Sequence, residues 1–334
     1  MKLDVLIPSL LLTAPLHKLL PPPIVPVLEK LLARADRQSE VVPTGSSWLC
    51  RRWGVGAPCP IAPLLAAYDG FDTSSGGWMF AAPVHLKPNG DRLDLFKTDF
   101  LELSGVETAE FIATLNTHFA DRNLQFCART PDRWYVRCSP AEIPLTTSPH
   151  AARTGSLIDS QPKSSGTLDW RSLQNESQML FFAHRVNDAR EAMGKPTVSG
   201  VWFWGGGLLP ELKTPAYDRV VANSPLSIQL ATNSGIEVQP LSWAAVQSAK
   251  GNVLAVIDSC NELAGSFDLP GWARELERLD DEWFLPMSAA LGRGAIERLR
   301  LHVPDGEFTH SYQITRRQQR LRFWRNAVPL SSHA

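Results

Sequence analysis

Residue types that catalyse reactions or bind metal ions are sparse in this sequence. Eight His and five Cys are scattered over 334 residues, and the densest cluster is LHVPDGEFTH, which holds His302, Asp305 and His310. Two imidazoles and a carboxylate are ligands that Mn²⁺ or Zn²⁺ accepts. However, Pro-Asp-Gly is also typical of a turn between two strands. We expect a turn here and keep Asp305 and His310 as candidate metal ligands.

Further candidates follow an apolar run. Asp258, Asn261 and Glu262 come directly after residues 253–257, and ligand sites of α/β proteins gather at the carboxyl ends of such strands. Asp258 and Glu262 could bind a cation there. Alternatively, Glu262 simply begins a helix or lies in a loop.

A third group could bind a small anion. Gly205–Gly207 follow the apolar run Val201–Trp204, and their backbone N–H groups could cradle a phosphate. The same glycines could equally form a tight turn, since no Lys and no GxGxxG spacing accompanies them. Asn187 and Arg190 lie near a predicted helix break, where Arg190 could hold a carboxylate or phosphate with two hydrogen bonds. It could instead tie the helix end to a loop.

The elements that must position these residues alternate along the chain. Strands are predicted at 3–7, 201–204, 219–222, 236–240, 253–257 and 299–303, with helices at 169–193, 242–250 and 270–291 and one capped by Asn223. Continuous apolar strands separated by helices indicate an α/β fold, a mostly parallel sheet covered by helices on both faces.

A segment that predicts hairpins interrupts this alternation of strands and helices. Residues 85–100 and 124–138 each predict a hairpin, and a helix is predicted between them from Thr108, its N-cap, to Phe119. Residues 139–167 are rich in Ser, Thr, Pro and Gly and predict a connecting loop. We therefore expect an α/β core of residues 1–84 and 151–334 with an inserted α+β domain at 85–150.

Composition excludes several classes of protein. The formal net charge is −1, which gives no global argument for binding nucleic acid or an anionic membrane. No apolar run reaches the roughly 18 residues of a spanning helix. Asp4 and Pro8 interrupt what would otherwise resemble a signal peptide. The five Cys are odd in number and lack a CxxC spacing, so we expect reduced thiols and a cytoplasmic protein.

One local charge cluster departs from the neutral total. The segment Arg316–Arg325, RRQQRLRFWR, holds five Arg interleaved with Phe323 and Trp324. Such a composition can bind nucleic acid. The interpretation we favour is an antiparallel edge strand over residues 310–325, whose charges prevent pairing with other sheets.

Three segments together resemble the archaeal-type cofactor-independent phosphoglycerate mutases of the alkaline phosphatase superfamily. These are residues 180–207, the α+β unit at about 90–140, and residues 251–280. Within the first, the matching residues are His184, Val186, Asn187, Arg190, Gly194, Lys195, Pro196 and Gly205–Gly207. The resemblance implies an alkaline-phosphatase-like α/β core with an inserted domain. It is nearest to bacterial phosphoglycerate mutase-like proteins, among them regulatory proteins of the RpfE type.

The departures from that family concern its chemistry. Members hold two divalent metals about 4 Å apart beside a Ser or Thr nucleophile. By the resemblance, Pro8, Ser266 and Gly306 stand where metal ligands belong, and Ser46 matches the nucleophile only loosely. A Ser hydroxyl that no metal activates is a poor nucleophile.

The sequence thus predicts a degenerate, non-catalytic phosphoglycerate mutase-like protein with a regulatory or binding role and no cofactor. Its partner would be a small phosphorylated ligand or another protein. The alternative is a metal-dependent mutase or phosphohydrolase that uses Ser46 with Mn or Zn at a reduced site.

Overall fold

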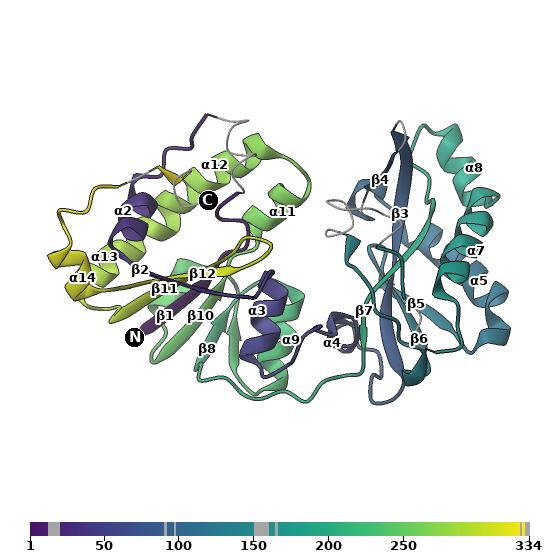
Figure 1. Cartoon of the computed structure of the whole chain (residues 1–334), viewed down its shortest axis with the longest axis horizontal. Coiled ribbons are helices and arrows are strands. Elements are labelled where there is room, and N and C mark those ends of the chain that lie inside the picture. The colour runs from purple at the N-terminus through teal and green to yellow at the C-terminus, as the bar shows by residue number, and fades with distance from the viewer. Residues whose placement is uncertain are drawn as a thin grey trace. The chain divides into compact units, whose positions relative to one another are not determined.

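The computed structural model describes residues 1–12, 21–89, 92–96, 98–149, 160–163, 166–327 and 329–330. The chain divides into two compact units (Figure 1). The first unit combines residues 1–57 with 211–334, and the second comprises residues 58–210.

The first unit is built on a seven-stranded sheet with the strand order β2-β12-β11-β1-β10-β8-β9. Strands β11, β1, β10, β8 and β9 run parallel, and β12 and β2 are antiparallel to their neighbours. The bounds are β1 (Lys2–Leu6), β2 (Asp36–Glu40), β8 (Arg219–Val221), β9 (Glu237–Gln239), β10 (Asn252–Val256), β11 (Arg298–Pro304) and β12 (Thr309–Thr315).

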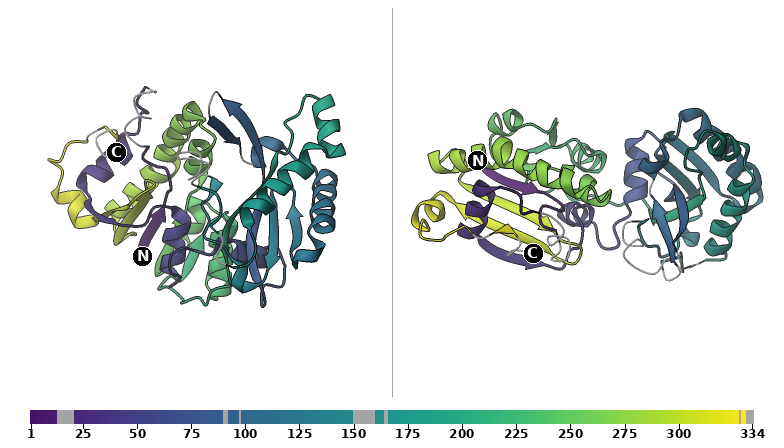
Figure 2. Two further views of the ribbon diagram at one scale, coloured as in Figure 1. Left: turned by 45° about the vertical axis from the view of Figure 1, so that its right-hand side comes forward. Right: turned by 90° about the horizontal axis from the view of Figure 1, so that it is seen from above.

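Helices cover both faces of this sheet (Figures 1 and 2). They are α2 (Pro26–Arg34), α3 (Gly45–Arg52), α9 (Pro225–Asn233), α10 (Trp243–Gln247), α11 (Ser259–Gly265), α12 (Leu269–Leu279), α13 (Leu285–Arg293) and α14 (Arg316–Leu321). A π-helical segment, Asp280–Phe284, joins α12 to α13. The predicted α/β fold with a mostly parallel, doubly covered sheet is confirmed.

The central strand β1 shows why the two faces differ. Leu3 and Val5 are fully buried in the core that α2, α12 and α13 share with the sheet. The alternate residues, Asp4 and Leu6, point to the other face, where Trp48 of α3 packs on His302 with ring centroids 4.4 Å apart. The face under α2, α12 and α13 is therefore mainly apolar, whereas the face under α3 carries the charged Asp4 beside His302.

The second unit has its own antiparallel sheet. The strand order is β4-β3-β6-β5, and β7 pairs with the free side of β3. The elements are α4 (Ile61–Tyr68), β3 (Gly77–Asn89), β4 (Arg92–Phe96), α5 (Gly105–His118), β5 (Gln125–Thr130), β6 (Arg133–Cys138), α7 (Trp170–Phe182), α8 (Arg185–Ala192) and β7 (Gly200–Gly207). Short 3-10 turns lie at Thr98–Leu101, Ala120–Arg122 and Pro140–Glu142. An aromatic core that includes Phe111, Trp134 and Trp170 joins the sheet to α5 and α7.

The boundaries of the inserted unit differ from the predicted 85–150. Strand β3 already begins at Gly77, and β7 pairs with it over Val84–Trp78. Residues 58–84 and 151–210, which we assigned to the core, therefore belong to the second unit. Pairing between strands distant in sequence leaves no local compositional signal. The change from alternating strands and helices to hairpins therefore indicated only part of the second unit.

Several local predictions also need correction. The predicted helix at 169–193 is two helices, because His184 caps a new helix through its own imidazole. Helix α5 begins at Gly105, and its N-cap is Ser104, which forms a capping box with Glu107, and not the predicted Thr108. The cap of α9 is Ser224 and not Asn223.

The structure of residues 316–325 also differs from the prediction. After β12 the chain forms helix α14, capped by Thr315 together with Gln318, so residues 316–325 are not an edge strand. The alternation of Arg with apolar residues suggested a strand, but the capping box starts a helix instead.

Cys50 and Cys59 each take part in a disulfide, and Cys127, Cys138 and Cys260 are free. The prediction of uniformly reduced thiols is therefore wrong. Disulfides are typical of oxidising compartments, so the cysteines no longer support the predicted cytoplasmic location. Within the described residues, no helix combines the length and apolarity needed to cross a bilayer.

Candidate functional site at the carboxyl end of the first sheet

The helix α3 lies directly against the loop that follows β1. A Cβ added to Gly45 would come within 2.6 Å of Pro8 Cγ, so this contact requires glycine. Thr44 caps α3 by accepting a hydrogen bond from Ser47 N at 3.1 Å. The Ser46 hydroxyl lies 3.1 Å from Thr44 Oγ1. Among the described residues no imidazole or carboxylate contacts Ser46, so no general base prepares it for attack.

The loops after β1 and β10 meet through polar side chains. The Ser9 hydroxyl donates to Asn261 Oδ1 over 3.2 Å, and Ser9 adopts a left-handed conformation with φ of 58°. Asp258 begins α11 beside Ser224. Burial raises the pKa of Asp258, the Glu262 carboxylate raises it further, and the Ser224 hydroxyl partly offsets the rise. Asp258 is thus a recessed carboxyl group held by the protein, and Glu262 is exposed.

Asp305 is occupied by its own turn. Its Oδ1 accepts the backbone N–H groups of Glu307 and Phe308 at 2.9 and 2.7 Å, and its Oδ2 lies 2.9 Å from His310 Nε2. Burial raises the pKa of Asp305, but these hydrogen bonds outweigh burial and lower it overall. Asp305 and His310 therefore stabilise the turn between β11 and β12, as the turn interpretation expects.

The sequence did not reveal one partner of this turn. Ser39 on β2 lies opposite His310, and its hydroxyl is 2.7 Å from His310 Nδ1. Ser39, His310 and Asp305 thus form a continuous hydrogen-bonded chain. Only the pairing of β2 with β12 brings Ser39 there, and no local pattern in the sequence announces it. The chain fixes the ring of His310 between two partners, and Ser39 itself is exposed on an edge strand.

The described residues at the carboxyl end do not provide the ligands of a two-metal centre. Within the described part of the chain, no three His, Cys, Asp or Glu side chains gather closely enough to bind one ion. Pro8 offers no side-chain donor, and Asp305 already accepts three hydrogen bonds. The residues present do not fit the pair of divalent metals that the family resemblance implies.

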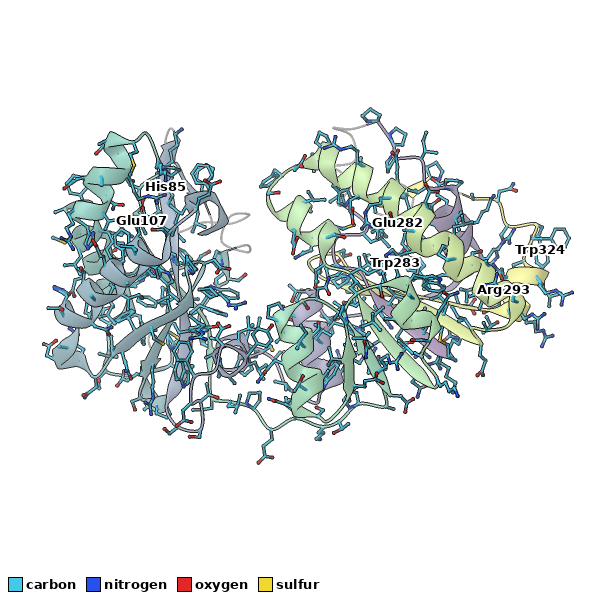
Figure 3. The ribbon with its side chains drawn as sticks, turned by 180° about the vertical axis from the view of Figure 1, so that it is seen from behind. His85, Glu107, Glu282, Trp283, Arg293 and Trp324 are labelled. Carbon is cyan, nitrogen blue, oxygen red and sulfur yellow. The ribbon has the colours of Figure 1, made fainter. Side chains whose placement is uncertain are left out.

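The predicted anion-binding residues of the second unit have structural roles. Arg190 is fully buried and donates to Pro196 O at 2.7 Å, to Glu107 at 2.7 Å and to Leu101 O. Glu107 is labelled in Figure 3. The Asn187 side chain bonds the backbone of Phe181 and Val198. Both side chains are committed to holding α8 in place, so of the two alternatives for Arg190 the geometry favours the structural one.

The three glycines lie in a strand, not in a turn. Gly205–Gly207 end β7, where side chains at Gly206 and Gly207 would collide with Met79 and Pro60. Gly205 has a φ of 67°, and its Cβ would lie 3.1 Å from Phe80. Close packing of β7 requires these glycines, so their presence needs no bound phosphate to explain it.

The Arg-rich tail is partly anchored. Arg322 donates to Arg34 O and to Asp36 Oδ1, at 2.8 and 2.7 Å, and Arg325 reaches Ala33 O. These contacts attach the end of α14 to α2. Trp324 remains 64% exposed (Figure 3). Nucleic-acid binding by this tail stays a prediction with fewer free guanidinium groups than the sequence suggested.

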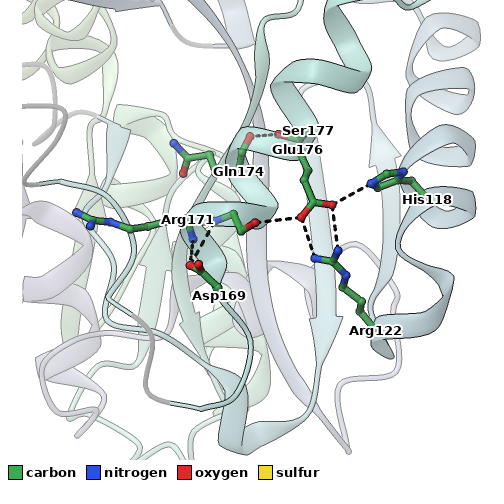
Figure 4. Close-up of polar contacts among 8 residues, drawn as sticks. His118, Arg122, Asp169, Arg171, Gln174, Glu176 and Ser177 are labelled. Carbon is green, nitrogen blue, oxygen red and sulfur yellow. Dashed lines mark hydrogen bonds and ion pairs between the residues drawn. The ribbon is translucent and has the colours of Figure 1, made fainter.

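A groove in the second unit was also missed. It has a volume of about 660 Å³ and lies between α5 and the α7–α8 junction. On its wall, Glu176 lies 3.0 Å from His118 Nε2 and accepts two hydrogen bonds from Arg122 (Figure 4). The hydrogen bond from His118 contributes most to the lowered pKa of Glu176. Met179, which also lines the groove, is 74% exposed.

Comparison with known proteins adds the fold. No family model and no curated protein matches the sequence. The PH0037 protein from Pyrococcus horikoshii matches with a TM-score of 0.52 and 13% identity, over 94% of this chain and 87% of that one. The two chains share a fold. The cofactor-independent phosphoglycerate mutase from Thermoplasma acidophilum matches with a TM-score of 0.43 and 14% identity, over 94% of this chain and 90% of that one.

Proposed function

We propose that this chain is a non-catalytic phosphoglycerate mutase-like protein that acts by binding, in a regulatory role. The observation that supports this most is the state of the carboxyl end of the first sheet. There Asp305 and His310 are used by their own turn, Asp258 is recessed, and Ser46 has no base among the described residues. Catalysis by this superfamily needs clustered metal ligands around a nucleophile.

Metal analysis and turnover test the proposal together. We expect the purified protein, dialysed against Mn²⁺ or Zn²⁺, to retain neither ion at one equivalent or more. We also expect no hydrolysis of p-nitrophenyl phosphate and no interconversion of phosphoglycerates. Binding of two metal equivalents with metal-dependent turnover would overturn the proposal in favour of the mutase or phosphohydrolase alternative.

Paired serine variants identify the source of any turnover that is found. Ser46→Ala removes the candidate nucleophile, and Ser47→Ala is the matched control, since both residues lie in the first turn of α3. Turnover abolished by the first variant and kept by the second would establish Ser46 as a nucleophile and end the non-catalytic interpretation. Equal rates in both variants would show that Ser46 is not the nucleophile.

A further inference from the structure

The amino end of the first sheet holds a cavity that no sequence motif announced. It has a volume of about 350 Å³, within the range of small-molecule sites. Side chains from the starts of β1, β10 and β11 meet there with the end of α3 and the segment before β8. Its lining is Lys2, Asp4, Arg52, Pro215, Ala216, Tyr217, Asn252, Arg298 and Arg300.

The cavity is strongly cationic. Four of its lining side chains are Lys or Arg and one is Asp, which gives a formal charge of +3. Strand register makes the crowding unavoidable, because Lys2 is the neighbour of Arg298 and Asp4 the neighbour of Arg300. Like charges this close repel unless an anion lies between them.

Protein contacts satisfy these charges only in part. Arg300 Nε donates to Gln313 at 2.7 Å. Arg52 lies over the Trp48 ring at 4.6 Å and forms an ion pair with Glu40 at 3.4 Å. By contrast, Arg298 Nε is buried without a hydrogen-bond partner, and its terminal nitrogen is 3.9 Å from Asp4 Oδ1, too far for a hydrogen bond. Across the described residues the Lys2 ammonium has no ion pair. Buried donors without partners are rare and call for an explanation.

Asp4 supplies a buried acceptor that also lacks a hydrogen-bond partner. Tyr217 OH donates to Asp4 Oδ2 at 3.0 Å, while Asp4 Oδ1 is buried with no hydrogen-bond partner. Burial raises the pKa of Asp4, but the nearby His302, Tyr217 and Arg300 outweigh burial and lower it. Burial lowers the pKa of His302. Asp4 is therefore a carboxylate at neutral pH, ready to accept one more hydrogen bond.

We propose that this cavity binds a small anion with a phosphate or carboxylate group and a neighbouring hydroxyl. The anionic group lies among Lys2, Arg298 and Arg300, because guanidinium groups match the oxygens of phosphate and carboxylate in geometry. The ligand's hydroxyl donates to Asp4 Oδ1, the remaining free acceptor. This site lies at the opposite end of the sheet from the residues that the proposed function concerns.

Calorimetric titration with three probes tests the proposal: inorganic phosphate, glycerol 1-phosphate and n-propyl phosphate. All are added at constant ionic strength. We expect the wild-type protein to bind each anion and to prefer glycerol 1-phosphate over n-propyl phosphate, which lacks the hydroxyl groups. The double variant K2Q/R298Q should bind all three at least about tenfold more weakly, the equivalent of about 1.4 kcal/mol. The control Arg274→Gln, an exposed residue of α12, should bind as the wild type does.

The variant Asp4→Asn separates the two parts of the site. It removes a negative charge, so inorganic phosphate should bind more tightly, while the preference for glycerol 1-phosphate over n-propyl phosphate should shrink. Unchanged binding in K2Q/R298Q, in a variant whose thermal unfolding shows that it is folded, overturns the proposal. So does the absence of binding to the wild type. Neither result bears on metal binding or turnover, so this site and the non-catalytic role can fail separately.

Discussion

At the carboxyl end of the first sheet Asp305 accepts hydrogen bonds from two backbone N–H groups and contacts His310, whereas at the amino end Arg298 Nε and Asp4 Oδ1 are buried with no such partner. Both ends belong to the same parallel strands. The family resemblance predicts a site at the carboxyl end, where such folds usually bind ligands. In this chain Asp305 and His310 at that end are already bound by protein groups.

The contrast separates polar groups that stabilise the fold from those that cost stability. A satisfied buried polar group contributes about 1 kcal/mol or more, while an unsatisfied one costs a similar amount. Substitution of the first kind should therefore destabilise the protein, and substitution of the second kind should be neutral or stabilising without ligand.

The largest loss of stability is expected on substitution of Arg190, for which Arg298 is the comparison. Arg190 is buried with three protein partners, and Arg190→Met leaves Glu107 and two carbonyl groups without their donor. We expect a loss of about 3–5 kcal/mol in the free energy of unfolding, the usual cost of breaking a buried ion pair. Arg298→Met should cost less than about 1 kcal/mol, since it removes an unsatisfied donor. Urea unfolding measures both, and equal losses would contradict the contrast.

An intermediate effect is expected at Asp305. Asp305→Ala frees two backbone N–H groups and His310, and should cost about 1–2 kcal/mol at pH 7. The lowered pKa of Asp305 means that this contribution is present above its ordinary value of 3.8 and is lost as the pH falls through the lower folded value. The difference between wild type and variant should therefore shrink below pH 4. Glu307→Gln, at an exposed neighbour, is the control and should show little difference at any pH.

The smallest effect is expected from Lys2. Lys2→Gln relieves repulsion with Arg298 and should raise the melting temperature slightly at low salt, by the equivalent of less than about 1 kcal/mol. Added NaCl should raise the wild-type value more than that of the variant, since salt screens partly exposed charges. Thermal unfolding in 20 and 300 mM NaCl checks this. A melting temperature lowered by the substitution would show that Lys2 has a protein partner and would weaken the contrast.

The α/β core could be predicted from the sequence because apolar β-strands alternate with amphipathic helices. Each of these elements shows in the pattern of neighbouring residues. The pairing of β3 with β7 could not be predicted, since the partners Trp78 and Gly207 are far apart in the chain and share no pattern. For Arg190 and Gly205–Gly207, which we predicted to bind an anion, the structure shows contacts within the protein, and anion binding stays a prediction. Arginine and glycine serve packing as readily as ligands, and only their partners distinguish the two.

A signal for the amino-end cavity was nevertheless present. Lys2 and Asp4 alternate with buried Leu3 and Val5, and the segment Arg298–His302 alternates in the same way. In a parallel sheet covered on both faces, strands are normally continuous runs of apolar residues. Charges at every second position of such strands therefore mark a face that is not wholly apolar. Which charges would lie side by side depended on the register of β1 with β11.

The position of β1 in its sheet also constrains how the chain folds. In the register of the central strand, Lys2 pairs with Asn252 on one side and with Arg298 on the other. Both partners follow in the chain only after the whole second unit. Such separations in sequence imply high contact order and slow formation, so β1 must stay unpaired, with exposed strand edges, until its neighbours emerge. The second unit is one continuous segment, residues 58–210, so it can fold before the first unit, whose strands lie on both sides of it in the sequence.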